Sequence, residues 1–389
     1  MRILTICPHY VPAYHFGGPL NVAHSLSKAL VKAGHQVTVC TTNLKNHQEN
    51  LDVPVDTPVS VDGVEVYYEP VFLFRYWGFS PGLWTRMARE VNRADVILVH
   101  AHYQFANWGG AKLARRSGKP YVIFAHGSLH FQGISHKSAR LKQLYLTLME
   151  RINFQNALFI VFNAPEEKDA SMFGELGKVI PSGIDPASFA TMPLPGYFRE
   201  LYPQLQDKPF ILFLGRLDIQ QKGLDLLIPA FGQLRRVCPG VHLVLAGPDE
   251  DEGGRLIRHL ALQHEVEDAV TLTGLISGQA KLAALQDADL FVLPSRFEGL
   301  SIALLEALYS GLPVVVTDRV GLWREVEKNR CGLVVPYDED SLAGALKRMA
   351  MAPDRREMGQ RGRQLVAAGY TWDKIARHLA AEIEQALTP

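Results

Sequence analysis

The first half of the chain alternates short apolar runs with segments of helical periodicity. Residues 21–33 place apolar side chains three and four positions apart, which predicts an amphipathic helix that ends at Gly34. Because strands and helices alternate, we expect a doubly wound α/β domain with a parallel sheet. Buried strands are predicted from apolar runs at 2–7, 35–41, 64–68, 95–99, 121–124 and 157–161.

A second α/β series follows a proline-rich stretch. Residues 181–209 contain six prolines, so we expect a linker there and divide the chain into domains 1–195 and 196–370. Residues 372–387 have an amphipathic pattern, and we expect the segment 371–389 to pack back on the first domain. The strands predicted for the second sheet are 210–214, 241–246, 269–273, 289–293, 313–317 and 332–335.

The residues that follow the apolar run 289–294 carry the strongest chemical signal. Glu298 and Gly299 lie on a loop, and Ser301 is a good N-cap for the apolar helix that contains Glu306. The free amides and the dipole of a helix start favour an anion. Acidic groups on both sides of such amides suit a nucleotide-sugar, which has hydroxyls at its ends and phosphates between them. The alternative is that both glutamates are merely solvated.

Two cations follow the first strand of the second series. Arg216 and Lys222 lie within the loop Gly215–Gly223, which precedes a helix predicted over 224–236. Ligands of open α/β sheets bind at the edge where the strands end. We therefore interpret the two cations as a clamp for a diphosphate, with solvated loop charges as the alternative.

The first domain has its own candidates at the corresponding strand ends. Gly17 and Gly18 precede the first helix without the dinucleotide-binding pattern GxGxxG, and we expect close approach of their backbone to a phosphate, or else a flexible loop. His126 follows the run at 121–124 and is interpreted as a site residue or a structural histidine. His100 and His102 follow the strand before it and suggest the same roles less strongly.

Composition and charge exclude several classes of protein. The chain has 389 residues, 47% of them hydrophobic, and a formal net charge of zero, so we expect two full cores and no nucleic-acid partner. The four scattered cysteines favour a reducing compartment. The start of the chain lacks the pattern of a signal peptide and no apolar run spans a membrane, so we expect a cytoplasmic protein. No carboxylate or cysteine joins the histidines at metal-ligand spacing, so we expect no metal. A nucleotide-sugar would be the substrate, and we expect no cofactor besides it.

One segment departs from this even distribution of charge. Residues 71–151 contain 12 Lys and Arg against 3 acids, a net charge of +9. They include an aromatic stretch with Phe72, Phe74, Trp77, Phe79 and Trp84. This composition suits peripheral contact with the inner face of an anionic membrane. It also suits contact with a lipid-phosphate acceptor. The alternative is a solvated helix face over core aromatics.

The whole chain resembles the GT-B-fold retaining glycosyltransferases of family 4, also called glycosyl transferases group 1. The resemblance rests on Gly17-Gly18 with the strand GHQVTV, His126-Gly127, the turn PSGID at 181–185, GRLDIQQKG at 215–223, and the segment from Glu298 to Glu306. These motifs are specific together rather than singly. Ser182 departs from the family, which often has Asn there.

The resemblance implies roles for these residues. It places two Rossmann-like domains across a cleft, with 1–195 binding the acceptor and 196–370 binding a nucleoside-diphosphate sugar. Arg216 and Lys222 would neutralise the donor diphosphate, Glu306 would hold the ribose, and His126 would lie by the reacting sugar. The remaining donor contacts would come from Gly17, Gly18, Gly215, Glu298, Gly299, Leu300 and Ser301, while Leu275 and Ile276 are candidates for the wall of the base pocket.

The implied activity is metal-independent transfer of a hexosyl group with retention to a glycan or lipid-linked acceptor, in envelope, exopolysaccharide or lipopolysaccharide synthesis. A GT-B-type sugar-nucleotide epimerase and a non-catalytic nucleotide-sugar-binding subunit remain alternatives. An NAD-linked dehydrogenase lacks its glycine fingerprint. The sequence does not identify the sugar, the base or the acceptor.

Overall fold

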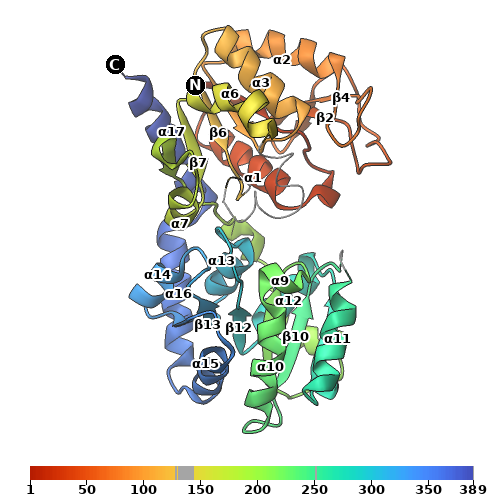
Figure 1. Ribbon diagram of the computed structural model, residues 1–389, viewed down its shortest axis with the longest axis vertical. Helices are drawn as coiled ribbons and strands as arrows, with labels where there is room; N and C mark the ends of the chain where they lie inside the picture. Colours follow the sequence, from red (N-terminus) through yellow and green to blue (C-terminus); the bar gives the residue numbers. More distant parts are fainter. Residues whose placement is uncertain (128, 130–143, 250–251, 389) are drawn as a thin grey trace. The chain divides into compact units, whose positions relative to one another are not determined.

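The computed structural model describes residues 1–127, 129, 144–249 and 252–388. The chain forms two compact units (Figure 1). The first comprises Met1–Gly183 and Trp372–Pro389, and the second comprises Ile184–Thr371. The division between Gly183 and Ile184 lies within the proline-rich stretch 181–209 and precedes the boundary expected at residue 195.

The first unit contains a mostly parallel sheet whose strand order is β3-β4-β2-β1-β5-β6-β7-β8. Only the pairing of β3 with β4 is antiparallel among the described pairs. The central strands are apolar and buried because helices cover both faces of such a sheet. The strands are β1 Arg2–Ile6, β2 Gln36–Thr42, β3 Val59–Val61, β4 Val64–Glu69, β5 Val96–His100, β6 Tyr121–Phe124, β7 Phe159–Phe162 and β8 Gly177–Val179.

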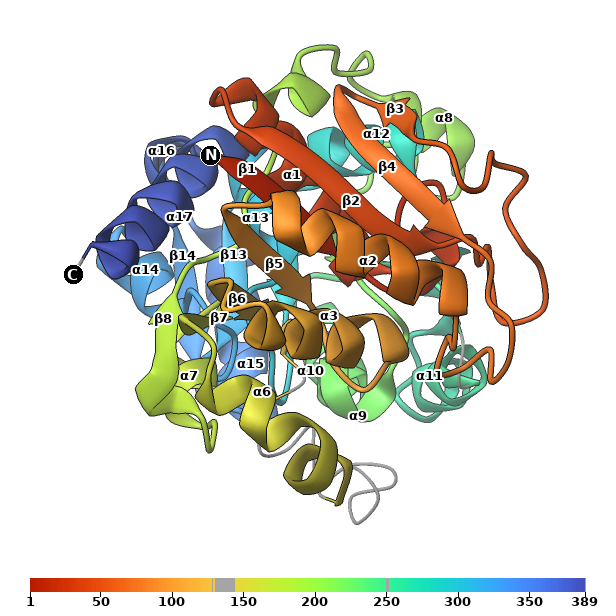
Figure 2. The same cartoon turned by 90° about the horizontal axis from the view of Figure 1, so that it is seen from above.

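Two groups of helices cover the faces of this sheet (Figure 2). Side chains of α1 and the C-terminal α17 pack on one face, and those of α2, α3 and α6 pack on the other. Lys32 on α1 and Asp373 on α17 add an ion pair of 2.6 Å. The helices are α1 Gly18–Lys32, α2 Pro81–Arg93, α3 Phe105–Arg116, α6 Arg151–Gln155, α7 Pro165–Asp169 and α17 Trp372–Leu387.

The second unit contains a parallel sheet with the order β11-β10-β9-β12-β13-β14. Its first strand, β9, therefore lies beside its fourth, β12, and the chain leaves these two strands toward opposite sides. Ligands of doubly wound sheets bind at such a switch point. The strands are β9 Phe210–Leu214, β10 His242–Ala246, β11 Val270–Gly274, β12 Leu290–Leu293, β13 Val314–Thr317 and β14 Gly332–Val335.

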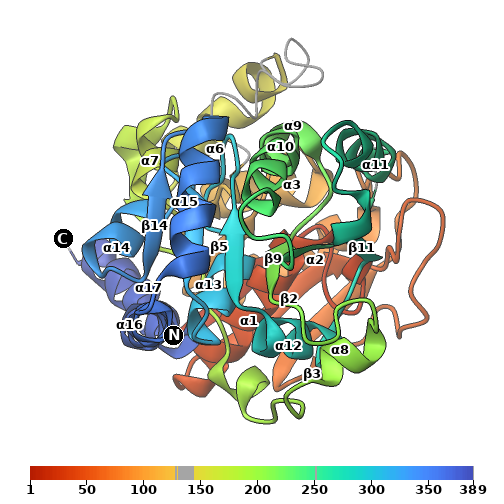
Figure 3. The same ribbon diagram turned by 90° about the horizontal axis from the view of Figure 1, so that it is seen from below.

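The helices of the second unit also lie on both faces of the sheet (Figure 3). Helix α10 packs with α11 and α15 on one face, while α13 packs with α16 and α12 packs with α8 on the other. The helices are α8 Tyr197–Leu201, α9 Ile219–Lys222, α10 Leu224–Arg235, α11 Gly253–Gln263, α12 Gly278–Asp287, α13 Ile302–Tyr309, α14 Trp323–Lys328, α15 Glu339–Met351 and α16 Arg355–Gly369.

The expected linker is folded. Phe198 and Leu205 are fully buried in the core of the second unit, and the carboxylate of Asp287 accepts hydrogen bonds from the amides of Gly196 and Phe198 at 2.7 and 2.9 Å. Most of the stretch 181–209 is therefore a folded part of the second unit, and only residues 181–183 lie in the first. None of the helices that the structure describes is long and apolar enough to cross a membrane.

Candidate functional site

The loop after β9 is built from glycines and one short helix. Asp218 caps α9 by accepting from the amide of Gln221 at 2.9 Å, and this turn ends at Lys222. Gly223 follows with φ +66°, and a Cβ placed there would overlap the carbonyl oxygen of Pro294 after β12. The backbones of the two switch-point loops therefore touch, which only glycine permits at this position.

This contact brings Lys222 to Glu298. The ammonium of Lys222 forms an ion pair with Oε2 of Glu298, and the two side chains are only 11% and 15% exposed. Oγ of Ser295 lies 3.5 Å from the same carboxylate oxygen. Arg216 lies in the same loop, where its guanidinium donates to Oε1 of Gln221 at 3.1 Å. The sequence placed these charges at one edge, but it did not predict that Lys222 and Glu298 pair.

The backbone of Glu298 is fixed from the next loop of the sheet. Its amide donates to the carbonyl of Arg319 at 3.1 Å, and its carbonyl accepts from the amide of Gly321 at 3.0 Å. Three residues later Oγ of Ser301 accepts from the amide of Leu304 at 3.3 Å and caps α13, as predicted. The turn that holds Gly299 and Leu300 is thus anchored on both sides next to a helix start.

The other candidates of the second unit lie on α13 or follow other strands of the same sheet. Glu306 on α13 pairs with Lys281 on α12 at 2.6 Å, a partner that the sequence did not reveal. Leu275 and Ile276 follow the end of β11; Leu275 is 73% exposed, whereas Ile276 is half-buried against the core. Gly215 directly follows β9, and its carbonyl packs against Gly247, the residue after β10.

In the first unit, Gly17 and Gly18 open the first helix. Gly17 is the N-cap of α1 with φ +76°, and Gly18 is the first helical residue. A Cβ placed on either residue would meet no atom within 4 Å. The helix start is therefore open, in contrast to the tight contact at Gly223.

His126 is held in an unusual backbone conformation after β6. Its φ is +49°, which non-glycine residues rarely adopt. Nε2 of its imidazole lies 3.1 Å from Nδ1 of the fully buried His100 at the end of β5. Burial lowers the pKa of His126 to about 4 and that of His100 well below its ordinary value. The structure thus brings two of the candidate histidines into one hydrogen bond.

A buried carboxylate, which the sequence did not indicate, fixes the residue after His126. Glu167 on α7 accepts from the amide of Gly127 at 2.8 Å and from the amide of Asn163 at 3.0 Å. Burial raises the pKa of Glu167 despite these bonds. Ser182, the departure from the family pattern, donates to Oδ1 of Asn163 at 3.0 Å and so joins the same network.

The switch point of the first unit lies between β1 and β5, and aromatic rings surround it. His9 after β1 stacks on Phe16 with centroids 3.4 Å apart, and its Nε2 lies 3.0 Å from the amide nitrogen of Gln104 after β5. His47 stacks on Tyr76 at 4.1 Å. Desolvation, with a smaller contribution from His47, lowers the pKa of His9 to about 3. This cluster was not predicted, although the histidines and aromatic residues within 8–20 were a sequence signal that could have indicated it.

The aromatic and basic segment 71–93 divides into two parts. Phe72 and Phe74 are 70% and 71% exposed, whereas Trp77, Phe79 and Trp84 pack against the core. The aromatic surface expected from the sequence is therefore confined to the tip of the 71–79 turn.

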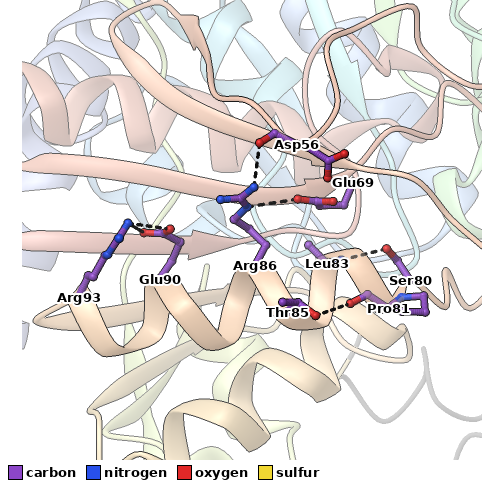
Figure 4. A network of polar contacts seen from close by, with 9 residues as sticks. All are labelled: Asp56, Glu69, Ser80, Pro81, Leu83, Thr85, Arg86, Glu90 and Arg93. Carbon is purple, nitrogen blue, oxygen red and sulfur yellow. Dashed lines mark hydrogen bonds and ion pairs between the residues drawn. The ribbon is translucent and has the colours of Figure 1, made fainter.

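One cation of this segment, Arg86, faces the protein, whereas Arg93 is largely exposed (Figure 4). Arg86 pairs with the buried Glu69 at 3.2 Å and donates to the carbonyl of Asp56, while Arg93 pairs with Glu90 at 3.2 Å. Glu69 lies outside residues 71–151, so its pairing with Arg86 means that the net charge of +9 overstates the positive surface; Glu90 is already counted in that charge. Lys137, Arg140 and Lys142, which contribute to that charge, lie outside the described residues.

Two Asp-x-Asp sequences, 287–289 and 338–340, could suggest a metal site, but both have structural partners. Asp289 accepts from the amide of Phe210 at 3.0 Å, and Asp338 caps α15 by accepting from the amide of Ser341 at 2.8 Å. Within the residues that the structure describes, no group of three or more His, Cys, Asp or Glu side chains has an arrangement suited to a metal ion.

Comparison with known proteins gives consistent matches along the chain. The family model described as Glycosyltransferase Family 4 matches residues 16–188, and the one described as Glycosyl transferases group 1 matches residues 199–365. An uncharacterized glycosyltransferase of Methanocaldococcus jannaschii is 28% identical over 97% of this chain and 96% of its own length. A phosphatidyl-myo-inositol mannosyltransferase of Mycolicibacterium smegmatis is 28% identical over 89% of this chain and 84% of its own.

Solved structures agree with this assignment. The sucrose-phosphate synthase from Thermosynechococcus elongatus aligns with a TM-score of 0.74 and 21% identity, covering 99% of both chains. Anabaena HepE in complex with UDP and glucose also aligns with a TM-score of 0.74, at 18% identity and 99% coverage of both chains. With two matching family models and this shared architecture, the chain belongs to the family 4 (group 1) glycosyltransferases and has their GT-B fold.

Proposed function

We propose that this protein moves a hexosyl group from a nucleoside-diphosphate sugar to a glycan or lipid-linked acceptor, with retention of configuration and without a metal ion. The observation that carries the proposal is the Lys222–Glu298 pair at the switch point of the second sheet, beside the capped start of α13. A cation and free helix amides suit the diphosphate, and a carboxylate suits a sugar hydroxyl.

The mechanism follows from charge. The bond between the anomeric carbon and the diphosphate oxygen breaks, and the leaving diphosphate gains negative charge that Lys222, Arg216 and the α13 amides stabilise. The acceptor oxygen bonds to the same face of the oxocarbenium-like sugar, and its proton passes to the leaving phosphate oxygen. No enzyme carboxylate forms a covalent bond in this scheme. A trapped sugar–enzyme adduct would contradict it.

A thermal-shift panel tests the donor site. UDP, GDP, ADP and CMP, each free and as its common sugar conjugates, are added in EDTA to wild type, Glu306→Ala and the control Glu327→Ala. Glu327 is exposed on α14 of the same unit. We expect one base to raise the Tm of wild type and the control, and to raise that of Glu306→Ala less. If no nucleotide shifts the wild type, the transferase proposal fails.

An acceptor assay separates transfer from epimerisation. With the identified donor, we expect nucleoside diphosphate to be released only when a glycan or lipid-linked acceptor is present, and NMR of the product to show the anomeric configuration of the donor. An altered sugar nucleotide without acceptor would favour an epimerase instead. One relative is named a phosphatidyl-myo-inositol mannosyltransferase, which supports a lipid-linked acceptor. A role in envelope glycan synthesis is part of the same proposal.

The second part of the proposal is peripheral contact with an anionic membrane. We assign this contact to the 71–79 turn alone. Its tip presents Phe72, Leu73, Phe74 and Tyr76, which are 70%, 48%, 71% and 76% exposed. Arg75 anchors the tip by donating to the carbonyls of His47 and Glu49 at 2.9 and 3.0 Å. A fixed backbone that exposes aromatic rings is suited to the headgroup region of a bilayer.

Liposome co-sedimentation checks this contact. We expect wild type to sediment with vesicles containing phosphatidylglycerol and the variant Phe72→Ser/Phe74→Ser to remain in the supernatant. Leu262→Ser is the matched control, because Leu262 is 62% exposed on α11 of the other unit. Equal sedimentation of all three proteins would exclude the tip as the contact.

A further inference from the structure

The hydrogen bond between His100 and His126 decides how His126 can act. β5 and β6 pair in the register His100↔Phe124, which sets the two histidines at neighbouring strand ends. The ring of His100 stacks on Phe124 with centroids 4.3 Å apart and a 7° interplanar angle. Its Nδ1 lies 3.1 Å from Nε2 of His126. One of these two nitrogens must donate and the other must accept.

Both imidazoles are neutral near pH 7, because burial lowers the pKa of each well below that pH. A neutral imidazole carries one N–H and one lone pair. If His126 donates, the proton of His100 lies on its own Nε2. If His100 donates, the proton of His126 lies on its own Nδ1. The two arrangements therefore differ in what each histidine offers to its other neighbours.

The environment of His100 distinguishes the two arrangements. Its Nε2 is buried and has no hydrogen-bond partner among the described residues. Donation by His126 would bury an N–H at that atom without an acceptor, whereas donation by His100 leaves only a lone pair there. Buried N–H groups without acceptors are rarer in proteins than buried acceptors without donors. This comparison favours His100 as the donor.

We infer that His100 is a positioning residue that fixes His126 as a hydrogen-bond donor through Nδ1. The lone pair of His126 accepts from His100, so its Nδ1–H is the group left to meet a ligand. Such a group donates to an oxygen of the bound sugar nucleotide, either a hydroxyl or a phosphate oxygen, and does not serve as a general base. The identity of this ligand rests on the proposed function; the tautomer does not.

The backbone supports the same assignment. His126 has φ +49°, and the amide of the next residue, Gly127, is held by the buried carboxylate of Glu167 at 2.8 Å. The ring is thus fixed on one side by His100 and through its backbone by Glu167. A side chain held in this way presents one atom in one direction, which is the requirement for preorganised binding.

Histidine-selective ¹⁵N NMR of the full chain tests the tautomer directly, with His126→Asn used to assign the signal. We expect the Nδ1 of His126 to carry the proton and its Nε2 to be unprotonated at pH 7. In His100→Leu, which lacks the donor, the Nε2–H form of His126 should appear; in His100→Asn, which retains an amide donor, it should not. A wild-type signal with the proton on Nε2 would overturn the inference.

Two isosteric variants test the consequence for activity. The amide nitrogen of Asn lies near the position of Nδ1, and that of Gln near the position of Nε2. We therefore expect His126→Asn to keep kcat/KM within about tenfold of wild type and His126→Gln to lose about 10²-fold. The reverse order would contradict the inference. A wild type that shows the expected tautomer but uses no sugar nucleotide would refute the proposed function alone.

Discussion

The two sheets share one strand order around their switch points, yet they place different chemistry there. In the second unit the loops after β9 and β12 bring together the charges of Lys222 and Glu298. In the first unit the loops after β1 and β5 bring together the neutral His9 and Gln104. The same fold thus supplies one edge suited to a charged diphosphate and another suited to uncharged polar groups. The strand order fixes where a site forms, and the loop residues fix what it binds.

The largest expected effect comes from removing the charge of the second unit. Lys222→Ala should lower kcat/KM about 10²–10³-fold, because a preorganised cation at the leaving group is lost. Arg235→Ala is the matched control: Arg235 pairs with Asp268 at 3.2 Å and lies at the C-terminal end of α10, the end opposite to the β9 loop. In steady-state kinetics, the kcat/KM of the control should lie within about twofold of the wild-type value, which corresponds to about 0.4 kcal/mol. A comparable loss of kcat/KM in both variants would show that Lys222 does not act through its charge at the leaving group.

The second prediction compares two glycines at helix starts: Gly17 at the N-cap of α1 in the first unit and Gly223 at the N-cap of α10 in the second. Gly223→Ala should cost about 4 kcal/mol or more, because the new Cβ overlaps the carbonyl of Pro294 in addition to straining the backbone. Gly17→Ala should cost about 1–3 kcal/mol from its positive φ alone, since its Cβ meets no atom. Hydrogen exchange of the core amides of each unit measures both losses of stability. A smaller loss for Gly223→Ala would mean that the two β-strand loops do not touch.

The third prediction concerns pH and the first unit. Desolvation raises the pKa of Glu150 to about 7, from an ordinary value of 4.5. The folded state therefore favours the protonated acid, so this contribution to stability is complete below about pH 4.5 and is lost as the pH rises to about 7. Between pH 5 and 8, wild type should lose up to about 3 kcal/mol relative to Glu150→Gln.

Urea denaturation at several pH values measures this difference. Glu327→Gln, at an exposed position of the second unit, should give a difference from wild type that does not change with pH. A pH-independent difference for Glu150→Gln as well would show that Glu150 is not desolvated in the folded state.

The smallest effect separates stability from binding within the second unit. Ser301 and Asp338 cap α13 and α15 in the same way, by accepting from the amide three residues later. Each substitution by alanine should cost about 1 kcal/mol of stability. Only Ser301→Ala should also weaken nucleotide binding in calorimetry, because only α13 begins beside Glu298. Equal nucleotide affinity in the two variants would argue against the α13 amides as phosphate ligands.

Most of the fold was predictable because doubly wound sheets bury their central strands on both faces. Apolar runs such as 289–293 therefore identified strands within one or two residues of their ends. The edge strands β3 and β8 were missed, since their residues are half-buried or exposed and show no such run. The stretch 181–209 was interpreted as a linker from its six prolines, although Phe198 and Leu205 within it are buried in the core of the second unit.

The candidate site was predictable in its location and less so in its contacts. Lys222, Glu298 and His126 follow strand ends, and the sequence alone placed them at ligand-binding edges. Their partners lie on other loops, which only the strand order of the sheet brings close. Glu298, for example, pairs with Lys222 although the two residues are 76 positions apart in the sequence. Glu167 gave no signal, because a glutamate in a short polar helix is ordinary until its burial is known.

The first unit is assembled from both ends of the chain. Helix α17 covers α1 with Trp372, Ile375, Leu379 and Ile383, all buried, although α1 is synthesised long before α17. During translation the apolar face of α1 therefore stays uncovered until the residues of α17 leave the ribosome, whereas every residue of the second unit has emerged by then. An interrupted polypeptide that ends before Trp372 would expose this face and become a substrate for chaperones and proteases.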